Sequence, residues 1–382
     1  MTTFFCLLSI FFYGLDAQVF PSLLTRLGSS SLQQGLILGS AFFFFPLSSI
    51  LAGYWADRVS KRLLLMAAMT LMALPFALLG LIEDVWMRIA AVLLFGLGSG
   101  AVESLSCSLL SDRNPGRERS ILNISQIFFS LGAAGGPALI AGLLHLLPGM
   151  GISGLLFLVA LVTAAAPFGF LFDGGEGGSP AGPPAGSWAA VLRDRTLLRL
   201  SLSLFLYVAA ESGSAAWLAK YGELYLGLSP SLSPICLSLF WAGLGLSRAL
   251  VGFFTISLSN RRLLSASLLL STAFQVLSFL MRDRSLALAS FFVLGFGMGP
   301  VWPTLIALAG SLFRESSGTA VGLLVALGGL GLPAVQLLIG LLSAPHLLGL
   351  RACLIALALL SLANLLVVQG CLDKGVCLSQ NA

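Results

Sequence analysis

Charged residues are scarce in this sequence, and that scarcity excludes most classes of soluble protein. Lys, Arg, Asp and Glu make up 9% of the 382 residues, whereas apolar residues make up 58% and the mean hydropathy is +1.00. Soluble domains carry about a quarter charged residues, so the surface of this chain must face lipid. The formal net charge of +5 comes from basic residues in loops and does not indicate a nucleic-acid-binding surface.

Motifs for catalysis and metal binding are also missing. The two histidines, His145 and His346, lie far apart near the ends of apolar runs, and the six cysteines have no metal-ligand or redox spacing. The sequence contains no phosphate-binding P-loop and no Gly-x-Ser-x-Gly turn. We therefore predict no enzyme activity, no cofactor and no metal site.

Long apolar runs are abundant instead. Twelve of them approach the ~20 residues that an α-helix needs to cross a bilayer, which predicts an all-α integral membrane protein with twelve transmembrane helices. The predicted spans are 3–25, 34–54, 62–82, 86–110, 118–144, 150–172, 197–222, 231–256, 261–282, 285–311, 317–344 and 347–370.

One break in composition divides these spans into two groups of six. The stretch 173–187 is rich in Gly, Pro and Ser, which is typical of a flexible linker. The predicted units are a first six-helix half at 1–172, a linker at 173–196, a second six-helix half at 197–370 and a tail at 371–382.

The two halves repeat one another. The glycine-rich run 96–100 returns at 295–299, and a Gly-to-Pro segment at 132–137 returns at 328–333. Glycines in such runs let another helix or a ligand approach the backbone closely. Parallel duplicated halves are typical of transporters whose substrate site lies at the midplane between them.

Basic residues are distributed unevenly between the two sets of loops. Thirteen of the twenty Lys and Arg residues lie in the tail and in the loops after the even-numbered spans, six lie in the other loops, and Arg248 lies inside the eighth span. By the positive-inside rule, both termini and the linker are cytosolic. We expect a monomer in the inner (cytoplasmic) membrane of a bacterium.

The loop between the second and third spans resembles a known family. Residues 53–62 contain Gly-x-x-x-Asp-Arg-x-x-Lys-Arg, which is similar to the signature loop of the major facilitator superfamily, and a degraded copy follows at 252–261. Within this superfamily the chain is most similar to the fucose–proton symporter and its sugar-porter relatives, on the stretches 96–103, 122–133 and 302–305. The resemblance implies the major facilitator fold, with two pseudo-symmetric halves and transport by alternating access.

The resemblance also implies a gate at the signature loop. Asp57 would meet the positive N-terminus of a facing helix and, with Arg58, would latch the cytosolic side shut in the outward-open state. Arg248 would belong to the matching charge network of the second half. Lys61 and Arg62 are interpreted as charges that only set membrane topology.

Two carboxylates within predicted spans are candidate proton or substrate sites. Glu103 has no charged neighbour in the sequence between Arg88 and Asp112, and a carboxylate at bilayer depth costs roughly 3 kcal/mol unless it is protonated, paired or wet. The resemblance assigns proton coupling to Glu103, and the alternative is a protonated carboxyl held by nearby hydroxyls. Asp16 resembles the first-helix acid of the symporters, and its alternative is a solvated residue near the outer mouth.

Three further polar residues are weighed as parts of a central site. Glu211 lies close to the repeat position of Asp16, and either binds substrate hydroxyls or lines an aqueous cavity. Asn123 and Gln126 are three residues apart and share one face of a helix. We expect Gln126 to face the cavity and Asn123 to be structural.

Tryptophans can stack on the flat apolar face of a sugar ring. Trp302 follows the second glycine-rich run and is the one for which we predict such a role. Trp217 and Trp241 are interpreted as members of the interfacial aromatic belt, which is the more common place for tryptophan in membrane proteins.

These observations predict a secondary active transporter. The first hypothesis is proton-coupled symport of a sugar or a similar small polar solute. The second is a proton antiporter that exports an amphipathic compound, because the interior is rich in Phe and poor in amides. The third is a transport-dead receptor or scaffold, which the buried acids and the signature loop disfavour. The expected partners are a small-molecule substrate, protons and the lipid bilayer, with no nucleic acid.

Overall fold

The computed structural model describes residues 2–56, 58–114, 118–172, 193–253, 259–313 and 317–371. In this described part of the chain nearly every residue is helical and no strand occurs. Eleven helices are long and apolar enough to cross a membrane, or twelve if one bent pair forms a single span. The all-helical membrane fold predicted from the apolar runs is therefore confirmed. The predicted linker at 173–196 and the predicted tail lie almost entirely outside the described residues.

The first half of the chain forms six spans, two of which are divided into consecutive helices. These helices are α1 (Thr2–Ala17), α2 (Val19–Ser22), α3 (Leu24–Leu27), α4 (Ser31–Phe43), α5 (Phe45–Ala56), α6 (Lys61–Leu81), α7 (Val85–Arg113), α8 (Glu118–Leu146) and α9 (Gly151–Ala165). The 3₁₀ turns η1 (Pro148–Met150) and η2 (Ala166–Phe172) flank α9.

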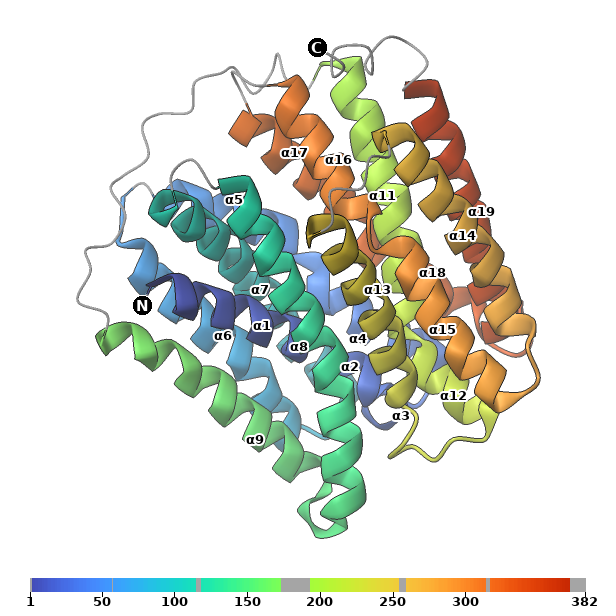
Figure 1. Ribbon diagram of the computed structural model, residues 1–382. Coiled ribbons are helices and arrows are strands. Elements are labelled where there is room, and N and C mark those ends of the chain that lie inside the picture. The colour runs from blue at the N-terminus through green and yellow to red at the C-terminus, as the bar shows by residue number, and fades with distance from the viewer. Residues whose placement is uncertain are drawn as a thin grey trace.

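The second half repeats this pattern. Its helices are α11 (Arg195–Ala216), α12 (Leu218–Leu226), α13 (Ile235–Phe253), α14 (Asn260–Leu280), α15 (Arg284–Met298), α16 (Val301–Leu312), α17 (Ser317–Gly329), α18 (Gly331–Leu342) and α19 (Gly349–Cys371). In Figure 1, α1, α6 and α9 lie to the left and α14, α15 and α19 to the right, with α8 and α13 packed between them.

Prolines account for most of the breaks within spans. Pro21, Pro46, Pro303 and Pro333 each fall within the first three residues of a helix that follows a break, in α2, α5, α16 and α18. Proline has no N–H group, so it is tolerated in the first turn of a helix, where that group has no partner within the helix. The bend of 47° between α11 and α12, at Trp217, has no proline.

Glycines allow the helices of the first half to pack at short distance. A Cβ atom added to Gly98 on α7 would lie 2.5 Å from the backbone nitrogen of Met72 on α6, and one added to Gly100 would overlap the carbonyl oxygen of Phe45 on α5. The close approach predicted for the glycine-rich run is thus a helix-to-helix contact. It holds α7 against two neighbours and fixes the position of the residues that follow it, including Glu103.

The two halves meet along two equivalent pairs of helices. α4 of the second span packs on α18 of the eleventh, and α8 of the fifth span packs on α13 of the eighth. The first contact is very close, because a Cβ atom on Gly35 would lie 2.6 Å from the Cα atom of Gly340. In the second contact, a Cβ atom on Gly245 would lie 3.0 Å from that of Ser130.

Candidate functional site

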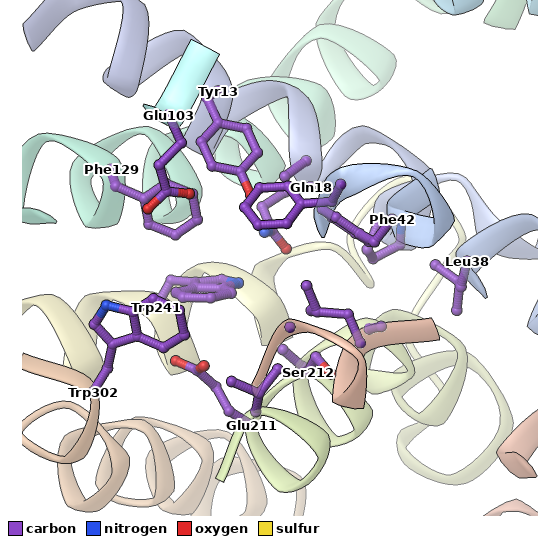
Figure 2. A pocket seen from close by; sticks show the side chains of 18 of the residues that line it. Tyr13, Gln18, Leu38, Phe42, Glu103, Phe129, Glu211, Ser212, Trp241 and Trp302 are labelled. Carbon is purple, nitrogen blue, oxygen red and sulfur yellow. The ribbon is translucent and has the colours of Figure 1, made fainter. Parts of the chain in front are cut away.

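A central cavity lies between the two halves. It encloses about 870 Å³ of empty space, with the open solvent at its mouth included. Figure 2 shows residues of the first half, such as Tyr13 and Phe129, on one side of it and residues of the second half, such as Ser212, on the other. Five of the site residues predicted from the sequence line this cavity: Glu103, Gln126, Glu211, Arg248 and Trp302.

Glu103 lies on α7 and lines the cavity. The side-chain amide of Gln126, on α8, donates to its carboxyl group. The Gln126 backbone carbonyl in turn accepts from the Ser130 hydroxyl at 2.9 Å. A carboxyl group held by an amide donor stays oriented toward the cavity whether or not it carries a proton.

Glu211 on α11 faces Arg248 on α13. Its Oε1 atom lies 3.6 Å from Nη2 of Arg248 and accepts from the Tyr207 hydroxyl at 2.8 Å. Both charged side chains are buried at this depth, with 11% and 6% of their surfaces exposed. Of the described residues that line the cavity, Arg248 is the only cation, and Glu103 and Glu211 are the only acids.

Arg248 lines the cavity, whereas the resemblance implied a place in a cytosolic charge network. Its Nε atom donates to the carbonyl oxygen of Gly299 at 3.2 Å, at the break between α15 and α16. Its Nη1 atom lies 3.4 Å from the hydroxyl oxygen of Ser130 on α8. The guanidinium group thus contacts both halves at the level of the cavity.

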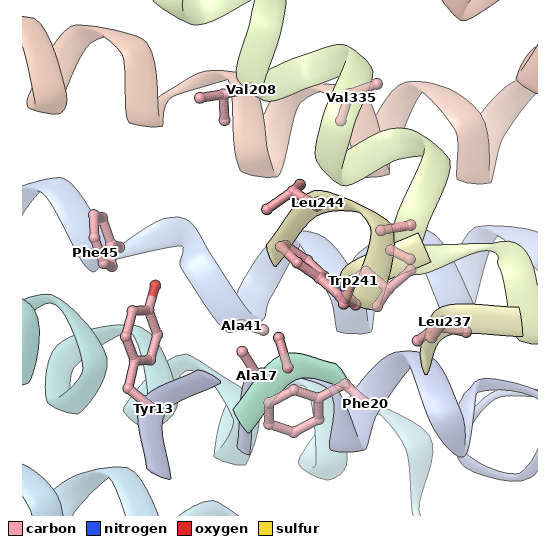
Figure 3. Packing of buried hydrophobic residues seen from close by; sticks show 14 of the residues in the cluster. Tyr13, Ala17, Phe20, Ala41, Phe45, Val208, Leu237, Trp241, Leu244 and Val335 are labelled. Carbon is pink, nitrogen blue, oxygen red and sulfur yellow. The ribbon is translucent and has the colours of Figure 1, made fainter. Parts of the chain in front are cut away.

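Aromatic side chains form much of the cavity wall. The ring of Phe129 lies 5.1 Å from that of Tyr13 and 5.7 Å from that of Trp241, so the three rings connect the first half to the second. Figure 3 shows Trp241 within the buried apolar cluster. The interpretation of Trp241 as an interfacial belt residue is therefore wrong, and it shares the cavity with Trp302, whose stacking role stays a prediction.

The interpretation of Trp217 as a residue of the interfacial aromatic belt is also wrong. Its side chain has no exposed surface, and its Nε1 atom donates to Oε1 of Gln336 at 2.8 Å. The Gln336 amide group then donates to the carbonyl oxygen of Ser212 at 2.9 Å. These bonds join α18 to α11 and to Trp217, which lies at the bend between α11 and α12. They fix the position of the cavity wall in the second half.

Asp16 is buried away from the other predicted site residues. It has no exposed surface, and its two carboxyl oxygens lie 2.8 and 3.0 Å from the Thr163 hydroxyl on α9, which donates to the carboxyl group. Asp16 is not among the residues that line the cavity. The structure thus places it inside the first half, neither solvated at the outer mouth nor beside Glu103.

The structure describes only part of the gate that was predicted at the signature loop. Asp57 lies outside the described residues. Arg58 is exposed, with its guanidinium carbon 3.6 Å above the ring of Tyr54 and its Nη1 atom donating to the Tyr54 carbonyl at 2.7 Å. Lys61 is more than a topology charge, because it is 1% exposed and its Nζ atom lies 2.6 Å from Oδ2 of Asp112.

One end of the cavity is closed by polar contacts between the halves. Lys220 on α12 donates to the side-chain oxygen of Gln34 at 2.5 Å and to the hydroxyl of Ser31 at 3.0 Å. The Thr25 hydroxyl donates to Glu223 at 3.1 Å. Sequence inspection missed this cluster because the partners are almost two hundred residues apart. It also missed Tyr13 in the wall, although Tyr13, Ala17 and Pro21 recur at helical spacing.

The family model of the Major Facilitator Superfamily matches residues 3–331. The chain belongs to the major facilitator superfamily. It is therefore a membrane transporter of that family, as the signature loop and the duplicated halves predicted.

Solved structures of this family share the fold over the whole chain. A bacterial homologue of the human lysosomal transporter Spinster, in an inward-facing and occupied conformation, has a TM-score of 0.79 at 14% identity and covers 97% of this chain and 96% of its own. The human organic anion transporter MFSD10 has a TM-score of 0.72 at 20% identity, covering 96% and 99%. The Escherichia coli fucose–proton symporter has a TM-score of 0.68 at 17% identity, covering 97% and 98%.

One curated relative is similar in sequence over part of the chain. It is the 4-hydroxybenzoate transporter PcaK of Pseudomonas aeruginosa, which is 31% identical over 146 residues. The alignment covers 37% of this chain and only 33% of that transporter. The likeness to the solved structures shows the fold, and neither comparison shows the substrate of this chain.

Proposed function

We propose that this chain is a proton-coupled symporter that carries a small amphipathic solute across the membrane by alternating access. One observation supports this proposal most directly: an apolar cavity between the halves contains Glu103, Glu211 and the guanidinium group of Arg248. Acids at this depth are expensive unless they are paired or protonated, and they mark proton or substrate pathways in membrane proteins.

The proton-coupled part of the proposal rests on the charge balance of the cavity. Arg248 can neutralise one carboxylate, and it lies nearest to Glu211. Glu103 has an amide as its hydrogen-bond partner, which orients its carboxyl group but cannot cancel a charge. A proton on Glu103 removes the remaining charge. We propose that Glu103 takes up a proton from one side of the membrane and releases it to the other.

The solute class follows from the cavity wall. A monosaccharide needs several hydrogen-bond donors and acceptors. The side-chain oxygen and nitrogen of Gln336, however, are both already hydrogen-bonded within the second half. Rings from Tyr13, Phe129 and Trp241 offer apolar contact area instead. This wall favours an amphipathic solute over the sugar implied by the resemblance. The name of the partial relative, a 4-hydroxybenzoate transporter, also supports an aromatic solute.

Alternating access is supported by the contacts that close one end of the cavity. The charge bias of the loops supports assigning that end, with Lys220 and Gln34, to the outer side of a bacterial inner membrane. The structure would then be an inward-facing state, in agreement with its high structural similarity to an inward-facing neighbour. Asp57 and Arg58 remain our candidates for the latch of the opposite end, and Asp16 remains a candidate second proton site.

Proteoliposomes test this proposal. Purified protein is reconstituted with a pH indicator inside, an inward proton gradient is imposed, and uptake is measured for aromatic acids, aromatic alcohols and monosaccharides. We expect gradient-driven uptake of an aromatic solute with internal acidification beyond that of protein-free liposomes, which report passive entry of protonated acids. Uptake of a monosaccharide alone would restore the sugar hypothesis. Solute entry coupled to proton exit would instead indicate an antiporter.

A further inference from the structure

The charged groups in the cavity indicate a more specific ligand than an amphipathic solute. We propose that the solute carries a carboxylate group, which binds Arg248 in place of Glu211 while Glu211 takes up a proton. This inference rests on the proposed function and names the chemistry of the same site. It is carried by the geometry around Arg248 and by an unpaired donor on the neighbouring Trp241.

The contacts that Arg248 makes toward the cavity are long. Charge-assisted hydrogen bonds between guanidinium and carboxylate are about 2.7–2.9 Å and are often bidentate. Here the distance from Nη2 of Arg248 to Oε1 of Glu211 is 3.6 Å, and Nη1 lies 3.4 Å from the oxygen of Ser130. The Nε atom has the shorter bond, at 3.2 Å to the Gly299 carbonyl. One side of the guanidinium group is thus anchored, and the two terminal nitrogens retain capacity for a carboxylate.

Trp241 supplies a second donor in the wall of the same cavity. Its indole Nε1 atom is buried and has no hydrogen-bond partner among the described residues. A buried donor without a partner is unfavourable in free energy, so the unpaired indole in a cavity wall is a candidate donor to a ligand. Figure 2 shows Trp241 between Glu211 and the first-half residues of the cavity.

The exchange at Arg248 balances in charge. Before binding, Glu211 and Arg248 form an ion pair. After binding, the solute carboxylate pairs with Arg248, and Glu211 becomes neutral by taking one proton from the side to which the cavity is open. The net charge of the site is unchanged, so one solute anion binds with one proton on Glu211, in addition to the proton that Glu103 carries. The Tyr207 hydroxyl, which already donates to Glu211, can remain in contact with the neutral acid.

Other ionisable groups face this pair from the neighbouring helices. Tyr207 lies on α11 with Glu211, Glu103 lies on α7, and the phenol of Tyr13 lies on α1 and interacts with both acids. None of these groups is a cation. Arg248 is therefore the only described lining residue that can hold an anion by charge, whereas a cationic solute at Glu211 would face the positive charge of Arg248.

Equilibrium binding to the purified protein in nanodiscs tests the inference without any transport. The probes are benzoate, 4-hydroxybenzoate and phenylacetate, each compared with its amide and with the corresponding amine, by isothermal titration calorimetry. We expect at least one acid to bind roughly 10- to 100-fold more tightly than its amide, the range for one charge-assisted contact. We also expect acid binding to weaken as the pH rises, since binding takes up a proton.

Variants assign the effect to the two residues. Arg248→Gln should reduce the affinity for the acid to that for the amide, whereas Glu211→Gln should strengthen acid binding at neutral pH and abolish its pH dependence. If Arg248→Gln does not fold because Glu211 is left unpaired, the double variant Arg248→Gln/Glu211→Gln removes both charges. Arg351→Gln, which changes an arginine 4.5 Å above the ring of Tyr225 and outside the cavity, is the matched control and should leave binding unchanged.

Three results would overturn the inference: equal binding of acids and amides, tighter binding of the amines, or acid binding that survives the loss of Arg248. Any of these would leave proton-coupled symport standing. Conversely, Arg248-dependent acid binding in a protein whose uptake in liposomes ignores the proton gradient would refute the proposed function. The carboxylate site would then still stand.

Discussion

The Lys220 ammonium group of the second half donates to the side-chain oxygen of Gln34 in the first half at 2.5 Å. The same nitrogen lies 3.0 Å from the Ser31 hydroxyl and 5.1 Å from the ring centroid of Trp217. The Gln34 amide nitrogen donates to the carbonyl of Gly28 at 2.8 Å, so its oxygen is free to accept from Lys220. One lysine thus joins the two halves at the closed end of the cavity, and these bonds must break for that end to open.

Replacing Lys220 should shift the conformational equilibrium. Lys220→Met keeps the length and apolar stem of the side chain but removes both bonds to the first half. Hydrogen bonds to charged groups contribute about 1.5–3 kcal/mol each, so the population open at this end should rise at least tenfold. The measurement is the rate at which a cysteine placed at Ser212 reacts with an impermeant thiol reagent from the outside. A Lys220→Met rate equal to that of the parent would show that Lys220 does not hold this end closed.

Gly35 sets the distance between the halves at the same end. In Gly35→Ala the new Cβ atom would lie 2.6 Å from the Cα atom of Gly340 and 2.7 Å from the carbonyl oxygen of Gln336, so α4 and α18 must separate. Overpacking of this kind costs about 1–3 kcal/mol. We expect the closed state to be lost and steady-state transport to fall about tenfold or more, measured in liposomes at equal protein content.

The matched control for Gly35 is Gly142 on α8. A Cβ atom there would meet no other atom within 4 Å, so Gly142→Ala should transport at the parental rate. If Gly35→Ala also transports at that rate, the close contact of α4 with α18 is not required for closure. Misfolding is distinguished by size-exclusion chromatography of both variants.

The apolar runs were sufficient to predict the spans, but not which residues face one another. The predicted span 62–82 and the helix α6 (Lys61–Leu81) differ by one residue at each end, because bilayer thickness fixes helix length. Glu103 was recognisable as an isolated charge. In contrast, the contact of Asp16 with Thr163 joins residues 147 positions apart, and nothing local indicates it. Composition likewise cannot tell that Trp241 faces a cavity and not the lipid interface.

Arg248 shows the same limit more sharply. Its position near the end of an apolar run suggested a cytosolic charge, which is the common place for arginine in a membrane protein. Its partners, Glu211 and the Gly299 carbonyl, lie on other helices and are brought to it by packing. The spacing of residues in the sequence predicts which of them share a face of one helix. It does not predict which face a helix turns toward its neighbours, because that depends on packing contacts such as those at the glycines.

The orientation of the chain is testable at the two ends of α6. Ser60 and Glu83 are both exposed and lie just outside this 21-residue helix, which is about 30 Å long. The charge bias predicts that Ser60 is cytosolic and Glu83 is external. In a background without the six native cysteines, an impermeant maleimide added to intact cells should label Glu83→Cys rapidly and Ser60→Cys only after lysis. The reverse pattern would invert the topology.

Glu103 provides the most direct test of proton coupling. Glu103→Gln keeps the shape of the side chain and its contact with Gln126, and it mimics the protonated acid but cannot release a proton. Accumulation driven by a pH gradient should therefore fall well below the parental level, because the proton carried by Glu103 no longer moves with the solute. Exchange of labelled for unlabelled solute needs no deprotonation and should survive. Both activities are measured in the same proteoliposomes.

The outcome separates coupling from a structural role for Glu103. A carboxyl group that only packs would give an amide variant with both activities nearly intact, or a misfolded protein with neither. Glu83→Gln, which changes an exposed acid between α6 and α7, is the control and should accumulate solute as the parent does. If a well-folded Glu103→Gln protein accumulates solute to the parental level, Glu103 carries no transported proton, and Glu211 or Asp16 would be the next acid to replace.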